Sequence, residues 1–443
     1  MTKIFDRFIT EITGLKMTIE TIDEHLPEKF AEDIKRCKDA LLLELYLQQK
    51  FTKKVDPKLS QMFDGFITIT KVDKKSKMLA YSIDNSKKPQ NMILNIEESH
   101  KIYEKAARTM RTTYNSFLVT ALIIFETAIS SLLKKIISKY SDIYLKDDEI
   151  KISKLLKFND IGKLKEQLIN NKVDEIMHQN VFEWLNLLKA KQKVNIEYDE
   201  KSKQFLEGYY RRNVIVHNNG IVNNEYLERI DALGISTNIK LGDAVDCSQT
   251  YINDFIDSSI YMLINIMYES TKLFKDEIDD FLDEIEDYAV NQISNQKYDL
   301  STLIFKKLSE KNISDEQHMI YIKINYWQSK KWNNQFKDVE EEVKRFDVSA
   351  KDDYIKLGKY ALLDDFDSMI TIVRTMSKNT DSVEKLNYTL EEWPIFKKFK
   401  ESEQYKAFVN EEKIINTSRS IENDTKYQET QKLIDTFETD NKN

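Results

Sequence analysis

Apolar residues recur at helical spacing along most of this chain. The clearest case runs from Glu97 to about Tyr140, where the second half, YNSFLVTALIIFETAISSLLKKIISKY, is apolar on nearly all sides. A helix of this kind is expected at the centre of a bundle. Glu126 lies inside it, and a carboxylate in that setting needs a partner. Further helices are predicted over residues 28–51, 160–189, 201–217 and 249–274.

Two short stretches have the pattern of strands instead, with β-branched and aromatic residues between polar turns. Phe66 to Thr70 and Met78 to Ile83 predict a β-hairpin. Residues 233–242, LGISTNIKLG, predict a second small hairpin between two of the later helices. We therefore expect a mainly α fold, with a helical bundle that carries a small β-hairpin excursion.

The C-terminal third contains an internal repeat. Tyr298, Trp332 and Phe366 follow one another at intervals of 34 residues, and seven residues after each stands an apolar residue: Phe305, Val339 and Val373. A 34-residue period in helix–turn–helix units resembles tetratricopeptide repeats. Leu357-Gly358 and Phe366 match that family's small residue and aromatic residue, but the other repeats lack the glycine and none ends in the usual proline. An irregular stack of helical hairpins is the alternative.

These patterns divide the chain into four parts. We predict an N-terminal accessory region at 1–95, a helical bundle at 96–275, tetratricopeptide-like repeats at 276–411 and a disordered polar tail at 412–443. The 443 residues include only 8 glycines and 4 prolines, with no proline between Pro89 and Pro394. Because β-sandwiches and doubly wound folds need both residues at their turns, neither fold can dominate.

Charge, apolar run length, cysteine content and the absence of known motifs exclude several classes of function. With 67 basic and 75 acidic residues, the formal net charge of -8 argues against wholesale coating of nucleic acid and against an anionic membrane surface. The most apolar run, Phe117 to Phe125, is interrupted by Thr120 and is shorter than the roughly 20 residues that cross a bilayer. Cys37 and Cys247 form no CxxC pair, and no nucleotide-binding, zinc-protease or serine-hydrolase motif is present. We expect a cytoplasmic protein with no cofactor, no metal and no membrane partner.

The motif with chemical content is YYRRNVIVHNNGIVNNEYLERI, residues 209–230, in which Arg212, Asn213 and His217 form R-N-x-x-x-H. RNA cleavage without a metal requires proton transfer at the ribose 2′-OH and at the leaving oxygen, and stabilisation of charge on the phosphate. Histidine, with an ordinary pKa of about 6.5, suits the proton transfer, and arginine suits the phosphate. Asn213 shares a helix face with His217, whereas Arg212 lies about 140° away on an ideal helix. The Arg212 side chain must therefore curl round, or the backbone must depart from an ideal helix.

This motif resembles the R-x4-6-H signature of HEPN-domain ribonucleases, compact bundles of four or five helices. The resemblance covers residues 96–275 and implies a metal-independent endoribonuclease, with Arg212, Asn213 and His217 as catalytic residues. Arg211 and Tyr210 are weaker candidates for RNA contact. Glu126 corresponds to a polar residue that several members carry on an earlier helix to position the motif, with a purely structural ion pair as the alternative. Gly208 and Gly220 bracket the motif and predict backbone freedom there.

The motif offers one histidine, which is few for both an acid and a base. HEPN ribonucleases pair two motifs across a symmetric dimer, so the resemblance implies a homodimer through this bundle and an RNA substrate. Similar proteins are often toxins or antiphage abortive-infection effectors, and the repeats would bind a protein partner or a trigger. The alternative is a non-enzymatic helical-repeat adaptor with an inactive bundle that binds a protein partner or nucleic acid. The acidic balance and the absence of an obvious basic stripe favour that alternative.

Overall fold

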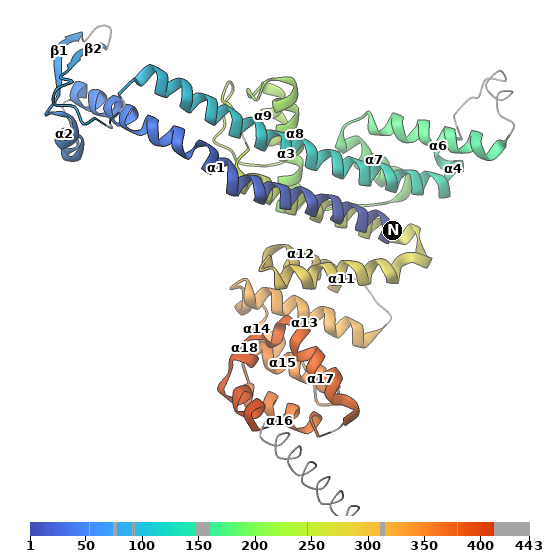
Figure 1. Cartoon of the computed structure of the whole chain (residues 1–443). Helices are drawn as coiled ribbons and strands as arrows, with labels where there is room; N and C mark the ends of the chain where they lie inside the picture. Colours follow the sequence, from blue (N-terminus) through green and yellow to red (C-terminus); the bar gives the residue numbers. More distant parts are fainter. Residues whose placement is uncertain are drawn as a thin grey trace, which may run out of the picture. The chain divides into compact units, whose positions relative to one another are not determined.

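The computed structural model describes residues 1–52, 54–73, 78–90, 92, 94–146, 160–245, 247–310, 315–378 and 380–411 (Figure 1). The chain divides into two compact units, unit 1 (Met1–Lys275) and unit 2 (Asp276–Asn443). Helices dominate both units, and the described residues contain one small sheet of two strands, so the predicted mainly α class is confirmed. The predicted tail, 412–443, lies outside the described residues.

Unit 1 is built around two long helices, α1 (Thr2–Thr52) and α3 (Ile96–Lys139), which lie side by side and antiparallel (Figure 1). Its remaining elements are α2 (Pro57–Phe63), β1 (Ile67–Asp73), β2 (Met78–Ile83), α4 (Ser141–Tyr144), α6 (Ile161–Met177), α7 (Val181–Gln192), α8 (Glu200–His217), α9 (Asn224–Ala232), α10 (Gln249–Ser270) and the short η1 (Thr271–Leu273). The first 95 residues thus belong to the same compact unit as the bundle.

Helix α1 is longer than predicted. Its buried apolar residues begin at the N-terminus, at alternating intervals of three and four: Phe5, Phe8, Ile12, Leu15 and Ile19. The helix continues through Pro27, so the predicted start at residue 28 is wrong. Proline cannot donate a backbone N–H. Contacts with α3 on both sides of Pro27 offset this loss: Phe8 packs on Phe125, and Glu44 Oε2 lies 2.7 Å from His100 Nε2.

Four phenylalanine rings join the main helices of unit 1 at its centre. Phe125 of α3 meets Phe8 of α1 edge to face, with 6.4 Å between ring centroids. On its other side Phe125 contacts Phe205 of α8 at 4.3 Å, and Phe205 stacks on Phe255 of α10 at 5.8 Å. All four side chains are almost completely buried. These contacts position α8, which carries the R-N-x-x-x-H motif, between α3 and α10.

Among the described helices, α3 alone has the length and apolar composition of a membrane-spanning helix. Half of its most apolar stretch is buried inside the protein, and α1, α6, α8 and α10 pack against the helix. This arrangement is the one expected of a core helix.

The strand predictions had different outcomes. β1 and β2 form the predicted antiparallel hairpin, with Ile67 opposite Ile83 and a bulge between Ile69 and Lys71. The second predicted hairpin is wrong, because residues 233–242 form no strand. The backbone that follows pairs instead with the segment after α8: Val222 N–H donates to Asp243 O at 2.9 Å, and Val245 N–H donates to Gly220 O at 2.8 Å.

The helix predicted over 160–189 is two helices, α6 and α7. His178 to Asn180 separate them, and the Asn180 side chain accepts hydrogen bonds from the backbone N–H groups of Phe182 and Glu183. An asparagine in this position caps the first turn of a new helix.

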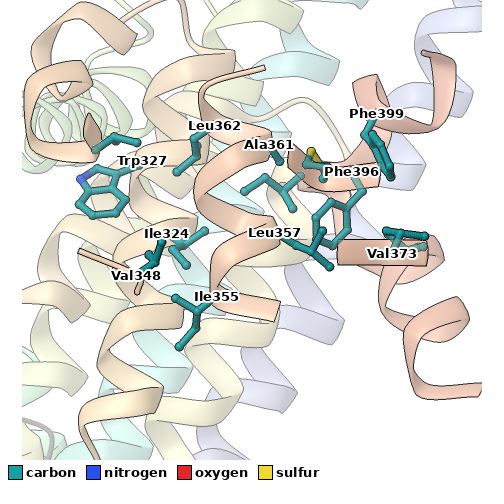
Figure 2. Close-up of a cluster of buried hydrophobic side chains, with 14 of the residues drawn as sticks. Ile324, Trp327, Val348, Ile355, Leu357, Ala361, Leu362, Val373, Phe396 and Phe399 are labelled. Atoms are coloured by element: carbon teal, nitrogen blue, oxygen red, sulfur yellow. The ribbon is translucent and has the colours of Figure 1, made fainter. Parts of the chain in front are cut away.

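Unit 2 is a series of shorter helices: α11 (Ile278–Ser294), α12 (Tyr298–Ser309), α13 (Glu316–Trp332), η3 (Phe336–Asp338), α14 (Glu340–Arg345), α15 (Asp353–Leu362), α16 (Phe366–Met376), α17 (Thr380–Glu392), η4 (Pro394–Phe396) and α18 (Lys397–Glu401), while η2 (Lys275–Glu277) spans the boundary between the units. Figure 2 shows side chains of these helices meeting in one buried cluster, with Trp327 of α13, Leu357 of α15 and Phe396 of η4 among them.

The turns of unit 2 reveal how the 34-residue repeat is built. Two residues after the end of each of α11, α13 and α15, the backbone is left-handed, at Gln296, Asn334 and Asp364. The N–H after each donates to the carbonyl five residues before it, as Lys297 does to Gln292. Gln296 and Asp364 are two periods of 34 apart, whereas Asn334 comes four residues late. Accordingly Tyr298 and Phe366 begin helices, but Trp332 ends one. Helices α11 and α13 both have 17 residues, so α13 begins and ends four residues later than a strict 34-residue period from α11 predicts.

Gly208 lies inside α8, and its backbone is helical rather than left-handed. The expected backbone freedom at this position is therefore wrong. A Cβ on Gly208 would lie 2.2 Å from Cε2 of Phe255, so glycine is needed here for the close approach of α10.

We predict that Gly208→Ala destabilises the protein. The overlap with the Phe255 ring outweighs the roughly 1 kcal/mol that alanine gains over glycine in a helix, for a net loss of about 1–3 kcal/mol in the free energy of unfolding. Urea denaturation of the full chain measures this loss. Gly14→Ala on α1 is the matched control, because a Cβ there meets no atom within 4 Å, and it should stabilise the protein. Equal effects of the two variants would contradict the packing role of Gly208.

Unit 2 also contains a histidine paired with a largely buried carboxylate. His318 Nε2 on α13 lies 2.5 Å from Glu286 Oε2 on α11. Burial by itself lowers the pKa of His318. The hydrogen bond and charge of Glu286, with smaller contributions from Asp283 and Asp315, raise this pKa by more, so its net value is above the ordinary 6.5. Burial also raises the pKa of Glu286, against the opposing effect of His318.

This pair predicts a pH-dependent stability. A histidine whose pKa is higher in the folded than in the unfolded chain stabilises the fold below its unfolded pKa, and this stabilisation is lost as the pH rises through the folded pKa. The difference in unfolding free energy between wild type and His318→Gln should thus be larger near about pH 6 than above about pH 8. Denaturation followed by tryptophan fluorescence tests this, and Glu286→Gln should remove the same pH dependence. A difference independent of pH would refute the assignment.

Candidate functional site

The R-N-x-x-x-H motif occupies the last two turns of α8, and the chain bends sharply after it. Asn219 and Gly220 both have left-handed backbone, with φ of 51° and 75°. The N–H groups of Asn218 and Gly220 both donate to the carbonyl of Val214. At Gly220 the expected glycine freedom is present, and it leaves His217 as the final residue of the helix.

Asn213 and His217 lie one turn apart and line the same pocket, between α8 and α9, which we term the His217 pocket. Its volume is about 330 Å³. The remaining lining residues are Tyr210, Val214, Asn218, Asn223, Glu225 and Tyr226. The His217 side chain is exposed and makes no hydrogen bond or ion pair with the described part of the chain. Its imidazole nitrogens are therefore available to an incoming ligand.

Arg212 points away from this pocket, toward α3. Its Nη2 lies 2.6 Å from Glu126 Oε1, and the two side chains are 20% and 29% exposed. The guanidinium also lies over the Tyr209 ring, 5.1 Å from its centroid. Burial raises the pKa of Glu126, and the positive charge of Arg212 opposes that rise. Glu126 thus has the partner that its position required, but the Arg212 side chain does not curl toward His217.

Arg211 and Tyr210, the two weaker candidates for RNA contact, have largely enclosed side chains. Arg211 Nε donates to Glu207 Oε1 at 2.8 Å, and its guanidinium stacks over Tyr251 at 4.2 Å. The hydroxyl of Tyr251 donates to Glu207 as well, at 2.5 Å. Tyr210 is buried and stacks on Phe182, with a 6.0 Å centroid separation and planes 18° apart. Little of either side chain is presented to a ligand, although Tyr210 forms part of the pocket wall.

Four polar residues of the His217 pocket were not singled out from the sequence: Asn218, Asn223, Glu225 and Tyr226. They lie in the run NNGIVNNEY directly after His217. A signal was present, because asparagines around a glycine indicate a tight turn that brings the following helix back beside the motif. Within the described ranges, no group of three or more His, Cys, Asp or Glu side chains is placed to hold a metal ion.

Apolar side chains are exposed near the same end of α8. Val216 is 51% exposed, and Ile123 on α3 is 56% exposed. Val216 and Val119 line one pocket, and Ile123 lies one turn beyond Val119. Together they form an apolar patch across α3 and α8, which we term the α3–α8 patch.

Comparison of the chain with protein-family models, curated proteins and solved structures finds no match. The residues and their geometry define a mainly α protein with a polar pocket around an accessible histidine at the end of a bundle helix.

We predict that the Arg212–Glu126 pair stabilises unit 1 through a coupled interaction. A double-mutant cycle of Arg212→Met and Glu126→Gln should give a coupling energy of about 1–3 kcal/mol, because neither side chain is more than a third exposed. Arg7 and Glu11 on α1 provide the matched control, with a 2.8 Å separation but greater exposure. Their coupling should stay below about 1 kcal/mol. Equal coupling in the two cycles would mean that burial does not strengthen the internal pair.

Proposed function

We propose that this protein is a metal-independent endoribonuclease of the HEPN type. The observation that carries the proposal is the accessible His217 imidazole beside Asn213, in a polar pocket at the end of a bundle helix. The reaction is transesterification: the ribose 2′-oxygen attacks the adjacent phosphorus, the 5′-oxygen leaves with a proton, and a 2′,3′-cyclic phosphate remains. The biological role that accompanies this proposal is that of a toxin or antiphage abortive-infection effector.

His217 transfers the proton in this reaction, either from the 2′-OH or to the leaving oxygen. Asn213, on the same face of α8, orients the imidazole or donates to a phosphate oxygen. Arg212 stabilises the charge on the phosphate, and Glu126 positions its guanidinium. Arginine has five N–H donors, so the contact with Glu126 leaves others for a phosphate.

A second copy of the chain completes the site in this proposal. One chain supplies a single accessible His217, and its Arg212 does not line the His217 pocket. A two-fold dimer would bring two copies of each residue to one phosphate, because a two-fold interface places identical surfaces in contact. The exposed Ile123 and Val216 of the α3–α8 patch supply apolar area for such an interface.

Cleavage of RNA in the presence of EDTA tests the proposal. His217→Ala should lower the cleavage rate by about 10²–10⁴-fold, because it removes proton transfer. Arg212→Ala should lower it as well, and the wild-type products should carry 2′,3′-cyclic phosphate ends by mass spectrometry. His178→Ala is the control, since this exposed histidine lies at the end of α6, outside the pocket, and it should leave the rate unchanged.

Expression in cells should arrest growth, and His217→Ala should relieve the arrest.

The enzyme proposal fails if the folded wild-type dimer cuts no RNA under any activating condition and the His217→Ala variant behaves identically. The alternative is then a non-enzymatic adaptor in which unit 2, as a tetratricopeptide-like stack, binds a protein partner. An aromatic pocket of about 230 Å³ in unit 2, lined by Tyr298, Trp332 and Trp393, favours this alternative. Trp332→Ala would abolish partner binding in an adaptor, and His217→Ala would not.

A further inference from the structure

The His217 pocket contains more polar side chains than proton transfer requires. Asn223 is the N-cap of α9, and Glu225 follows in the first turn of that helix. Asn218 lies at the start of the bend after α8. The pocket volume of about 330 Å³ is in the range of small-ligand sites. These three side chains are available to recognise a part of the substrate other than the scissile phosphate.

The free side-chain atoms of these residues include three acceptor oxygens. Asn218 Nδ2 donates to the carbonyl oxygen of Ile221, so its Oδ1 is a free acceptor. Glu225 is exposed and makes no hydrogen bond or ion pair with the described residues, so both of its carboxylate oxygens can accept. Asn223 Oδ1 accepts from the N–H of Tyr226 at 2.9 Å, which leaves Nδ2 as a donor. The set suits a ligand edge with more donors than acceptors.

The aromatic walls of the pocket are held in place by contacts within the protein. The Tyr226 hydroxyl donates to Glu207 Oε1 at 2.6 Å, so it is already engaged. Tyr210 is buried, and the Arg229 guanidinium lies 5.9 Å from its ring centroid. Arg229 is one helical turn after Glu225, but the two form no ion pair in the described part of the chain. The carboxylate therefore remains free to accept from a ligand.

Guanine is the RNA base that matches this set of groups. Its Watson–Crick edge has two adjacent donors, N1–H and the N2 amino group, beside one acceptor, O6. The two oxygens of one carboxylate can accept both donors side by side, and an amide can donate to O6. Adenine and cytosine place a single amino donor beside a ring acceptor, and uracil places one N–H between two carbonyls. Each of these bases would set a carboxylate oxygen against an acceptor, which is unfavourable.

We propose that the His217 pocket binds the guanine base of the nucleotide whose 2′-oxygen attacks, with Glu225 accepting from N1–H and N2–H and Asn223 donating to O6. This inference rests on the proposed function. The ribose of that nucleotide carries both the 2′-OH and the 3′-phosphate, so a base held in this pocket brings both groups to the His217 imidazole. The protein then cuts RNA after guanosine and leaves guanosine 2′,3′-cyclic phosphate ends.

Binding of mononucleotides tests base recognition separately from cleavage. The 3′-monophosphates of guanosine, inosine and adenosine are titrated into the full-length protein in EDTA and followed by calorimetry. Inosine lacks only the N2 amino group, so wild type should bind 3′-GMP about tenfold more tightly than 3′-IMP, the effect of one hydrogen bond to a charged group. Glu225→Gln should bring this ratio to about one, because glutamine has one acceptor oxygen instead of two. Glu228→Gln is the matched control, since this exposed residue of α9 lies outside the pocket, and it should keep the wild-type ratio.

The proposal is overturned if wild type binds the three nucleotides with equal Kd, or if Glu225→Gln and Glu228→Gln give the same GMP-to-IMP ratio. Sequencing of the RNA ends provides a second measurement, because wild-type cleavage after all four bases at similar rates would refute guanine selection and leave the ribonuclease proposal intact. Failure of the proposed function is a separate result. A protein that prefers 3′-GMP but cuts no RNA would support the base site and refute the cleavage.

Discussion

The contact between Phe125, Phe205 and Phe255 is the interaction on which the rest of unit 1 depends. It places α8 between the central helix and α10, and the glycine at position 208 allows that spacing. A buried aromatic pair contributes about 0.5–1.5 kcal/mol beyond its area of burial. The three rings thus hold α8 against both neighbouring helices, and the Arg212–Glu126 pair adds a polar contact between α8 and α3. His217 then lies at the end of α8, beside α9 and the bend.

The C-terminal end of α8 has two faces that differ in charge balance and in exposure to solvent. Toward α3, Arg212 is partly enclosed and matched by a carboxylate, so its charge is balanced inside the protein. Toward α9, His217 meets asparagines and one glutamate and remains open to solvent. A single chain thus directs Arg212 and His217 to different faces. In the proposed function, this separation is the reason for including groups from a second copy.

Local patterns were sufficient for the parts of the fold that local forces determine. The apolar period of α3 and the alternation in β1 and β2 predicted those elements, because each buries its own repeating face. Long-range contacts were not predictable in the same way. α1 runs through Pro27 because α3 supports it on both sides, and residues 242–245 pair with 220–222 rather than forming a hairpin. In the site, the sequence indicated that Glu126 needs a partner, and the resemblance implied that it positions the motif, but neither identified Arg212, 86 positions away, as that partner.

The left-handed bends that follow α11, α13 and α15 have a consequence for how unit 2 can change during evolution. Four residues advance a helix by about 6 Å and rotate it only about 40° beyond a complete turn. A hairpin lengthened by four residues therefore returns its chain on nearly the same side, and its neighbours can keep their buried faces. An insertion of two residues would rotate the exit by about 200° and direct the chain into solvent. Length variation in such a stack is expected to occur in whole helical turns.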